Sequence, residues 1–180
     1  MRTVVRIGVV TVCLLSLAAC ATTMRSLVDP ETWVDPTDGV EVTRAGIRFG
    51  GKTLTLPTDE ARLVQVLGPY DRSEMAKNRI LVWDQLGIFA YQSPDADVIE
   101  AVSVSFSCAE LDFCPKAAYP GTIVIGDAVF RKPAEPREFL RYGFRADEFF
   151  CFKNRGKYQL SVACIDGGPS LGLFEVGLRD

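Results

Sequence analysis

The side chains that could do acid–base or metal chemistry in this chain of 180 residues are carboxylates, lysines and cysteines, because it contains no histidine. That absence excludes histidine-based triads, histidine-ligated metals and the usual proton shuttle at neutral pH. The most conspicuous remaining group is Asp84, which follows Trp83 in the stretch ILVWDQLGIF of residues 80–89. Its carboxylate either serves chemistry or shapes a turn.

The spacing around Asp84 favours the turn. Asp84 and Gly87 occupy the first and fourth positions of a predicted type I turn, where these residue types are favoured. We expect a hairpin in which Trp83 lies opposite Phe89. The carboxylate is then a structural turn residue, and we assign no catalytic residue in the chain.

A second segment, FFCFKNRGKY at residues 149–158, repeats this pattern with Phe152 in place of Trp83 and Lys153 in place of Asp84. We expect Phe152 to lie opposite Tyr158, with Lys153 at the tip that matches Asp84. Because a turn tolerates lysine at this position and a shared catalytic acid would not, the repeat supports the structural interpretation of Asp84.

The rest of the chain also repeats. GIRFGGKTLTLP at residues 46–57 matches TIVIGDAVFRKP at residues 122–133, and each reads as two strands joined by a glycine-containing two-residue turn. A short helix follows each hairpin, the first capped by Thr58 and the second beginning at Pro136. The predicted fold is α+β, with two tandem ββαβββ repeats that each form an antiparallel sheet with one short helix.

The beginning of the chain has the pattern of an export signal. Two arginines precede an apolar run at residues 7–17 that is too short to remain as a membrane span. The sequence Leu17-Ala18-Ala19-Cys20 resembles the lipobox of bacterial lipoproteins. This resemblance implies a signal peptide cleaved before Cys20, attachment of palmitate and related acyl chains to Cys20, and, because Ala21 is not aspartate, a place on the periplasmic face of the outer membrane.

These patterns predict the domain boundaries. We expect a signal peptide at 1–19, a polar tether at 20–40, a first repeat at 41–108, a connector at 109–119 and a second repeat at 120–180.

Four cysteines remain beyond the signal and the lipidation site. Four cysteines in an oxidising compartment indicate two disulfides among Cys108, Cys114, Cys151 and Cys164, with three possible connectivities. We favour Cys108–Cys114. The predicted hairpin places Cys151 opposite Gln159, on the other face from Cys164, which makes a Cys151–Cys164 bridge awkward. We retain this bridge only because these two cysteines remain once Cys108 pairs with Cys114. A zinc site built from all four is the weaker interpretation, and we expect neither metal nor cofactor.

Charge is unevenly distributed. Removing residues 1–19 takes away two arginines and leaves about −5 (−3 minus 2), yet residues 130–160 hold eight Lys or Arg against four Asp or Glu, about +4. Lys153, Arg155 and Lys157 cluster in the second predicted hairpin. They are either a solvated rim or a surface for an acidic partner or anionic headgroups. The net negative charge argues against nucleic acid as a partner.

The motif W-D-x-L-G-I at residues 83–88, after a strand–turn–strand–helix pattern, resembles an uncharacterised bacterial domain family over residues 44–107. The resemblance implies a fold and no activity. We therefore expect a non-enzymatic envelope lipoprotein that binds a protein in the periplasm, as an immunity protein or an assembly accessory. The alternative is a small-ligand binder or a histidine-independent hydrolase with a groove between the repeats.

Overall fold

A computed structural model describes residues 39–107, 112–131, 136–147, 150–163 and 172–179, all within one compact unit of residues 34–180. These residues form thirteen strands and two helices, so the fold is mixed α and β. The elements are β1 (Val40–Val42), β2 (Ile47–Phe49), β3 (Lys52–Leu54), α2 (Glu60–Leu67), β4 (Arg72–Met75), β5 (Arg79–Trp83), β6 (Ile88–Gln92), β7 (Ile99–Ser105), β8 (Ile123–Ile125), β9 (Ala128–Phe130), α3 (Pro136–Arg141), β10 (Arg145–Ala146), β11 (Phe150–Arg155), β12 (Tyr158–Ala163) and β13 (Leu173–Leu178).

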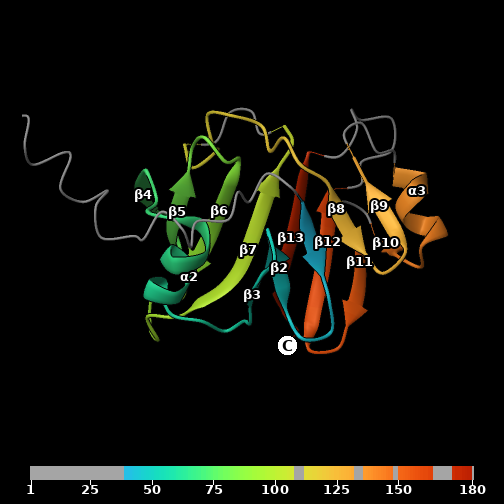
Figure 1. The fold of residues 1–180 in the computed structure, drawn as a ribbon, viewed down its shortest axis with the longest axis horizontal. Coiled ribbons are helices and arrows are strands. Elements are labelled where there is room, and N and C mark those ends of the chain that lie inside the picture. The colour runs from blue at the N-terminus through green and yellow to red at the C-terminus, as the bar shows by residue number, and fades with distance from the viewer. Residues whose placement is uncertain (1–38, 108–111, 132–135, 148–149, 164–171, 180) are drawn as a thin grey trace, which may run out of the picture. The chain divides into compact units, whose positions relative to one another are not determined.

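The strands lie in two sheets (Figure 1). The smaller sheet has the order β3-β2-β1-β8-β9, and the larger has the order β10-β11-β12-β13-β7-β6-β5-β4. All neighbours pair antiparallel except β1 and β8, which are parallel. The two predicted glycine-turn hairpins are confirmed as β2–β3 and β8–β9.

The two halves of the chain share both sheets, contrary to the expectation of one sheet for each repeat. In the small sheet β1 lies between the two hairpins, and in the large sheet β7 of the first half pairs with β13 of the second. Three strands were not predicted: β1 before the first hairpin, and β4 and β10, which each lie between a helix and the following hairpin. When the two halves share their sheets, strands that would be open edges of separate sheets become paired. This explains why separate sheets do not form.

The core lies between the sheets. One face of the large sheet packs against the small sheet and the two helices, and most buried side chains of both sheets belong to one cluster there. Ile80, Val82 and Phe89 form a second buried cluster on the other face of the large sheet. β1 contributes Val40 and Val42, both fully buried, although the tether was predicted to extend to residue 40. Their alternation with exposed or half-buried neighbours is the pattern of a strand with one buried face. In α2 the N-cap is Asp59, whose side chain accepts a hydrogen bond from the backbone of Arg62, and not Thr58 as predicted.

Both predicted hairpin registers are wrong. In the first hairpin the turn has four residues, so Trp83 lies opposite Ile88 and not Phe89. In the second, Gly156 adopts a positive φ of 65° and begins a two-residue turn, which places Phe152 opposite Ser161 and not Tyr158. A shorter turn lengthens the paired strands and shifts every pair.

Candidate functional site

Asp84 is buried between two cations. Its carboxylate forms ion pairs with Lys116 (Nζ–Oδ2 2.8 Å) and Arg72 (Nε–Oδ2 3.3 Å), and the backbone N–H of Lys116 donates to Oδ1 at 3.2 Å. Burial disfavours the charged carboxylate, but the hydrogen bonds from Lys116 and Arg72 outweigh it, so the pKa of Asp84 is lowered. A carboxylate held ionised by two cations is poorly suited to donate a proton.

The turn of Asp84 packs on the described part of the predicted connector, residues 112–119. The backbone N–H of Ala117 donates to the carbonyl of Asp84 at 2.9 Å. Gly87 approaches the same segment so closely that an added Cβ would lie 2.2 Å from the backbone nitrogen of Tyr119. Arg72 donates to two further carbonyls of this segment. The first hairpin tip therefore fastens the connector to the large sheet.

The second hairpin does not carry Lys153 at its tip. Lys153 lies within β11, where its ammonium donates to the carbonyl of Tyr142 and lies 5.8 Å from the ring centroid of Phe144. The tip consists of Gly156 and Lys157. The predicted contrast between Asp84 and Lys153 at matching tips is therefore wrong, because the two hairpins have different turn lengths. Lys153 is tied to the segment after α3.

Around Lys157 the fold gathers arginines from distant segments. Lys157 is exposed, and its carbonyl accepts a hydrogen bond from the backbone of Arg179 at 3.0 Å. A Cβ added to Gly156 would lie 3.7 Å from the carbonyl oxygen of Arg44, which places the turn before β2 against the hairpin tip. The guanidinium of Arg155 lies beneath the β8–β9 turn, within 3.7 Å of a Cβ built on Gly126. We call Arg44, Arg155, Lys157 and Arg179 the basic end.

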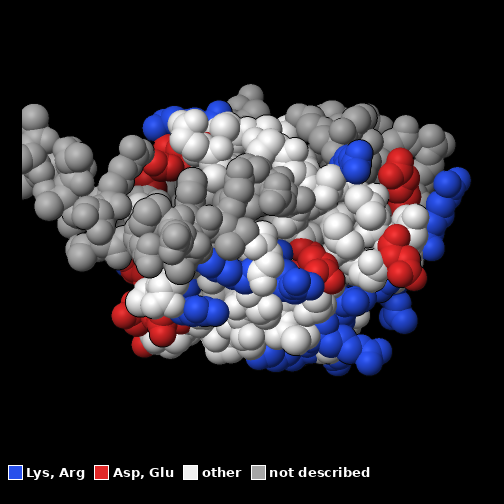
Figure 2. All heavy atoms as spheres, viewed as in Figure 1, with Lys and Arg blue, Asp and Glu red and all other residues white. Residues whose placement is uncertain are grey.

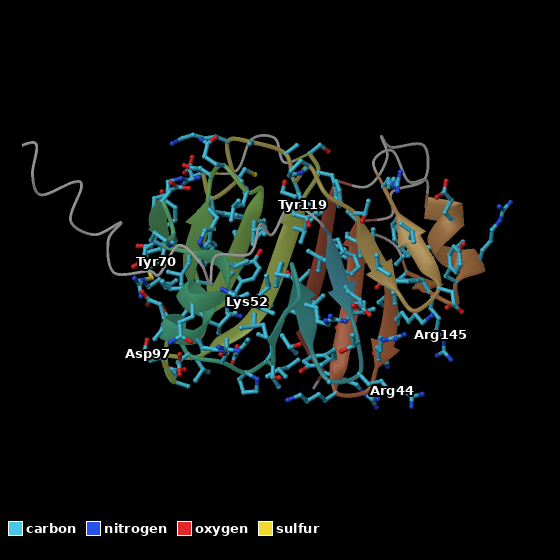
Figure 3. The ribbon with its side chains drawn as sticks, viewed as in Figure 1. Arg44, Lys52, Tyr70, Asp97, Tyr119 and Arg145 are labelled. Carbon is cyan, nitrogen blue, oxygen red and sulfur yellow. The ribbon has the colours of Figure 1, made fainter. Side chains whose placement is uncertain are left out.

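Within the part of the chain that the structure describes, the cations of the basic end have no acidic partner. None of the salt bridges among the described residues uses any of the four. Arg44, Lys157 and Arg179 are exposed, whereas Arg155 is half-buried and its Nε is buried without a hydrogen-bond partner. Arg44 projects from the lower edge of the view in Figure 3, where basic side chains gather on the same face in Figure 2. An unpaired cationic surface in a protein of net negative charge is suited to binding anionic groups.

Sequence reasoning found only part of this surface. Arg155 and Lys157 were identified from the local charge of residues 130–160, whereas Arg44 and Arg179 lie far from that segment in the chain. No sequence pattern joins them, because the turn before β2 and the end of β13 meet the hairpin only through the sheet topology. Lys153, the third predicted member, is held by its own contacts and is not part of the basic end.

The outer face of the large sheet carries a carboxylate that sequence reasoning missed. Glu175 of β13 lies opposite Ser103 of β7, and the Ser103 hydroxyl donates to its Oε2 at 3.0 Å. Burial raises the pKa of Glu175, and the hydrogen bond from Ser103 only partly offsets this. Burial, followed by the charge of Glu175, raises the pKa of Tyr91 to about 12. The alternation LFEVGL of β13 is the sequence signal that places Glu175 on this face.

The described cysteines restrict the disulfide pattern. The carbonyl of Cys114 accepts a hydrogen bond from Arg72 of β4 at 2.8 Å, whereas Cys151 lies in β11, six strands away in the large sheet. Six strand spacings amount to about 29 Å, and a disulfide needs Cα atoms within about 7 Å. Cys114 therefore does not pair with Cys151.

The observed register also removes the objection to Cys151–Cys164. Cys151 lies opposite Val162, and not opposite Gln159 as predicted. It shares a face with the alternate residues of β12 that lead to Cys164. Cys108 and Cys164 lie outside the described residues, as does Cys20, so two connectivities and the lipidation of Cys20 remain predictions.

The described ranges contain neither a candidate metal cluster nor a helix suited to span a membrane. There, no group of three or more cysteine, aspartate or glutamate residues could hold a metal ion. Neither helix in those ranges has the length and apolar character of a membrane span.

Comparison with known proteins identifies one family. The model of a domain of unknown function, DUF7738, matches residues 39–139, which run from the start of β1 into α3. The match extends beyond the expected residues 44–107 and crosses from the first half into the second. No curated protein and no solved structure matches the chain. Because the family model covers more than half of the sequence, the chain belongs to the DUF7738 family of unknown function.

Proposed function

We propose that this protein is an exported lipoprotein, anchored through Cys20, whose folded domain binds another protein in the periplasm and catalyses no reaction. The lipobox-like sequence supports the anchor, and the polar residues between Cys20 and β1 supply a tether. A lipid anchor with a tether lets a small domain reach a partner while it stays at the membrane. The outer membrane is the proposed location.

The observation that carries the binding function is the basic end. Its cations come from three separate segments, make no salt bridge among the described residues, and lie on a chain with a mature charge of about −5 (−3 minus 2). Opposed charges steer association and determine which partner is accepted. The partner is therefore a protein with an acidic surface.

A duplication of one unit supports this assignment. The order β2-β3-α2-β4-β5-β6-β7 recurs as β8-β9-α3-β10-β11-β12-β13, and we propose that the halves are tandem copies. The corresponding hairpins have different uses. The β5–β6 tip is occupied in fastening residues 112–119, whereas the β11–β12 tip presents Lys157 to solvent. One copy holds the domain together and the other is free to bind.

Capture of the partner from envelope extract tests the proposal. Full-length wild-type protein is compared with Arg44→Glu/Lys157→Glu and with a matched control, Arg62→Glu/Lys77→Glu, which makes the same charge change on exposed residues of the first half. We expect wild type and the control to retain the same protein and the basic-end variant to lose it.

The outcome that contradicts the proposal is equally specific. Recovery of no protein, but of a tightly held small molecule, would support a ligand-binding function instead. Equal retention of one protein by all three forms would remove the basic end from the binding surface. Raising the salt concentration should weaken capture, because the exposed charges are screened.

A further inference from the structure

The outer face of the large sheet brings Glu175 and Tyr91 together with small residues. In one row across the sheet, Tyr91 of β6 lies opposite Ala101 of β7, and Ala101 lies opposite Gly177 of β13. In the next row Ser103 lies opposite Glu175. Residues two apart on a strand share a face, so the five side-chain positions adjoin. Tyr91 and Glu175 therefore flank a floor made of Ala101 and Gly177.

Gly177 leaves this part of the floor without a side chain. A Cβ added there would meet only the Ala101 Cβ at 3.5 Å and the Glu100 carbonyl at 3.9 Å, both ordinary contacts. Gly177 has no unusual φ, so backbone conformation does not explain the glycine. A missing side chain between a carboxylate and an aromatic ring leaves room for a small group.

The carboxylate beside this floor lacks a cation. Its carboxylate accepts a hydrogen bond from the neutral hydroxyl of Ser103, and no salt bridge among the described residues includes Glu175. In its row Arg145 lies three strands away, or about 14 Å, and along its own strand Arg179 lies four residues away, or about 13 Å. A largely buried carboxylate without a cation is costly to the fold, and such a cost is commonly retained where a ligand supplies the missing charge.

We propose that Glu175, Tyr91 and the floor of Ala101 and Gly177 form a binding site for an alkylammonium group. The ammonium pairs with the carboxylate of Glu175 and lies against the face of the Tyr91 ring, and its alkyl chain covers the floor. This site lies on the face of the large sheet that is turned away from the small sheet. Its ligand has the opposite charge to those of the basic end, whose Arg179 follows Gly177 by two residues.

Calorimetric titration of the full chain, purified in a nonionic detergent, tests the site with n-butylammonium chloride. Neutral butyramide is the control ligand of similar size. We expect saturable binding of butylammonium, at least tenfold tighter than butyramide, and a loss of at least tenfold in Glu175→Gln. Gly177→Val should abolish binding by filling the floor while it leaves the carboxylate in place.

Two results would overturn the site. One is equal affinity for butylammonium and butyramide, or no saturable binding of butylammonium to wild type. The other is an unchanged affinity in both Glu175→Gln and Gly177→Val. Thermal unfolding of each variant shows whether a loss of binding reflects a loss of folding. Tyr91→Phe, which keeps the ring, should bind within about threefold of wild type, because the site uses the face of the ring and not its hydroxyl.

Discussion

Asp84 and Lys116 form an ion pair of 2.8 Å between residues 32 positions apart in the chain. The pair joins the tip of the first hairpin to the segment that leads into the second half. Because Arg72 contacts the same carboxylate and two carbonyls of that segment, three elements meet at one buried group. Asp84 therefore connects the halves of the domain.

Replacing Asp84 tests this structural role. Asp84→Asn removes the charge that two cations share, and we expect the free energy of unfolding to fall by about 1–3 kcal/mol, the range for buried hydrogen bonds to charged groups. Urea unfolding measures the change. Glu74→Gln is the matched control because Glu74 pairs with the same Arg72 at 2.7 Å but is exposed, and it should cost less than about 1 kcal/mol. Equal costs for the two variants would contradict the role of Asp84.

Gly87 tests the close approach of the turn to residues 112–119. Gly87→Ala combines a φ of 67° with a Cβ placed 2.2 Å from the Tyr119 nitrogen, and we expect a loss of at least about 2 kcal/mol. Gly51→Ala is the control, since Gly51 has a φ of 89° and nothing within 4 Å of its Cβ. It should lose only the backbone contribution of about 1 kcal/mol. Thermal unfolding compares the two, and similar losses would show that the turn has room to move.

The pH dependence of stability should contain two opposed contributions. The pKa of Asp84 is lowered by folding, so its stabilisation is present above the pKa in the unfolded chain and is lost as the pH falls through the folded value. The pKa of Glu175 is raised, so the folded state binds the proton more tightly and stability declines as the pH rises from the unfolded value through the folded one.

Glu175→Gln should remove the second contribution. The variant should therefore be more stable than wild type at pH 7, and the difference should disappear at a pH below about 4, where the unfolded carboxyl is protonated as well. Urea unfolding across this pH range measures both curves. A variant less stable than wild type at pH 7 would show that the charge of Glu175 supports the fold.

The disulfides are tested by mass spectrometry of unreduced peptides. We expect one peptide linking Cys108 to Cys114 and another linking Cys151 to Cys164. A peptide linking Cys114 to Cys151 would contradict their separation across the large sheet. A peptide linking Cys108 to Cys151 would agree with the described geometry and contradict the favoured pairing.

Lipidation is tested by labelled palmitate. Wild-type protein should incorporate the label, and Cys20→Ser should not, because the acyl chains are attached at that cysteine. Label that persists in Cys20→Ser would place the acyl chains elsewhere and refute the interpretation of Leu17–Cys20 as a lipobox.

Local patterns predicted the local elements well. The β2–β3 and β8–β9 hairpins follow from glycines that permit the positive φ of a two-residue turn, and α2 ends at Gly68 as its Gly-Pro signal indicates. The predicted registers of the longer hairpins were wrong because the turn that ends at Gly87 has four residues and the turn that begins at Gly156 has two, a difference that residue types alone do not reveal.

Long-range pairing escaped prediction for a different reason. Nothing in the sequence shows that β7 pairs with β13, or that Val40 and Val42 form the central strand of a second sheet. Those pairings bring Arg44 and Arg179 close to Lys157. They also place Gly177 in the same row of the large sheet as Tyr91. The turn residues near these sites could therefore be identified from the sequence. Which side chains come together at each site could not.

Site-specific crosslinking in intact cells tests the central claim most directly. A photoreactive benzoylphenylalanine is placed at Lys157 in the basic end, or at Lys77, an exposed lysine of the first half, in the otherwise unchanged chain. We predict a crosslinked protein product from position 157 and none from position 77. A product from position 77 alone, or none from either position, would contradict binding of a protein partner at the basic end.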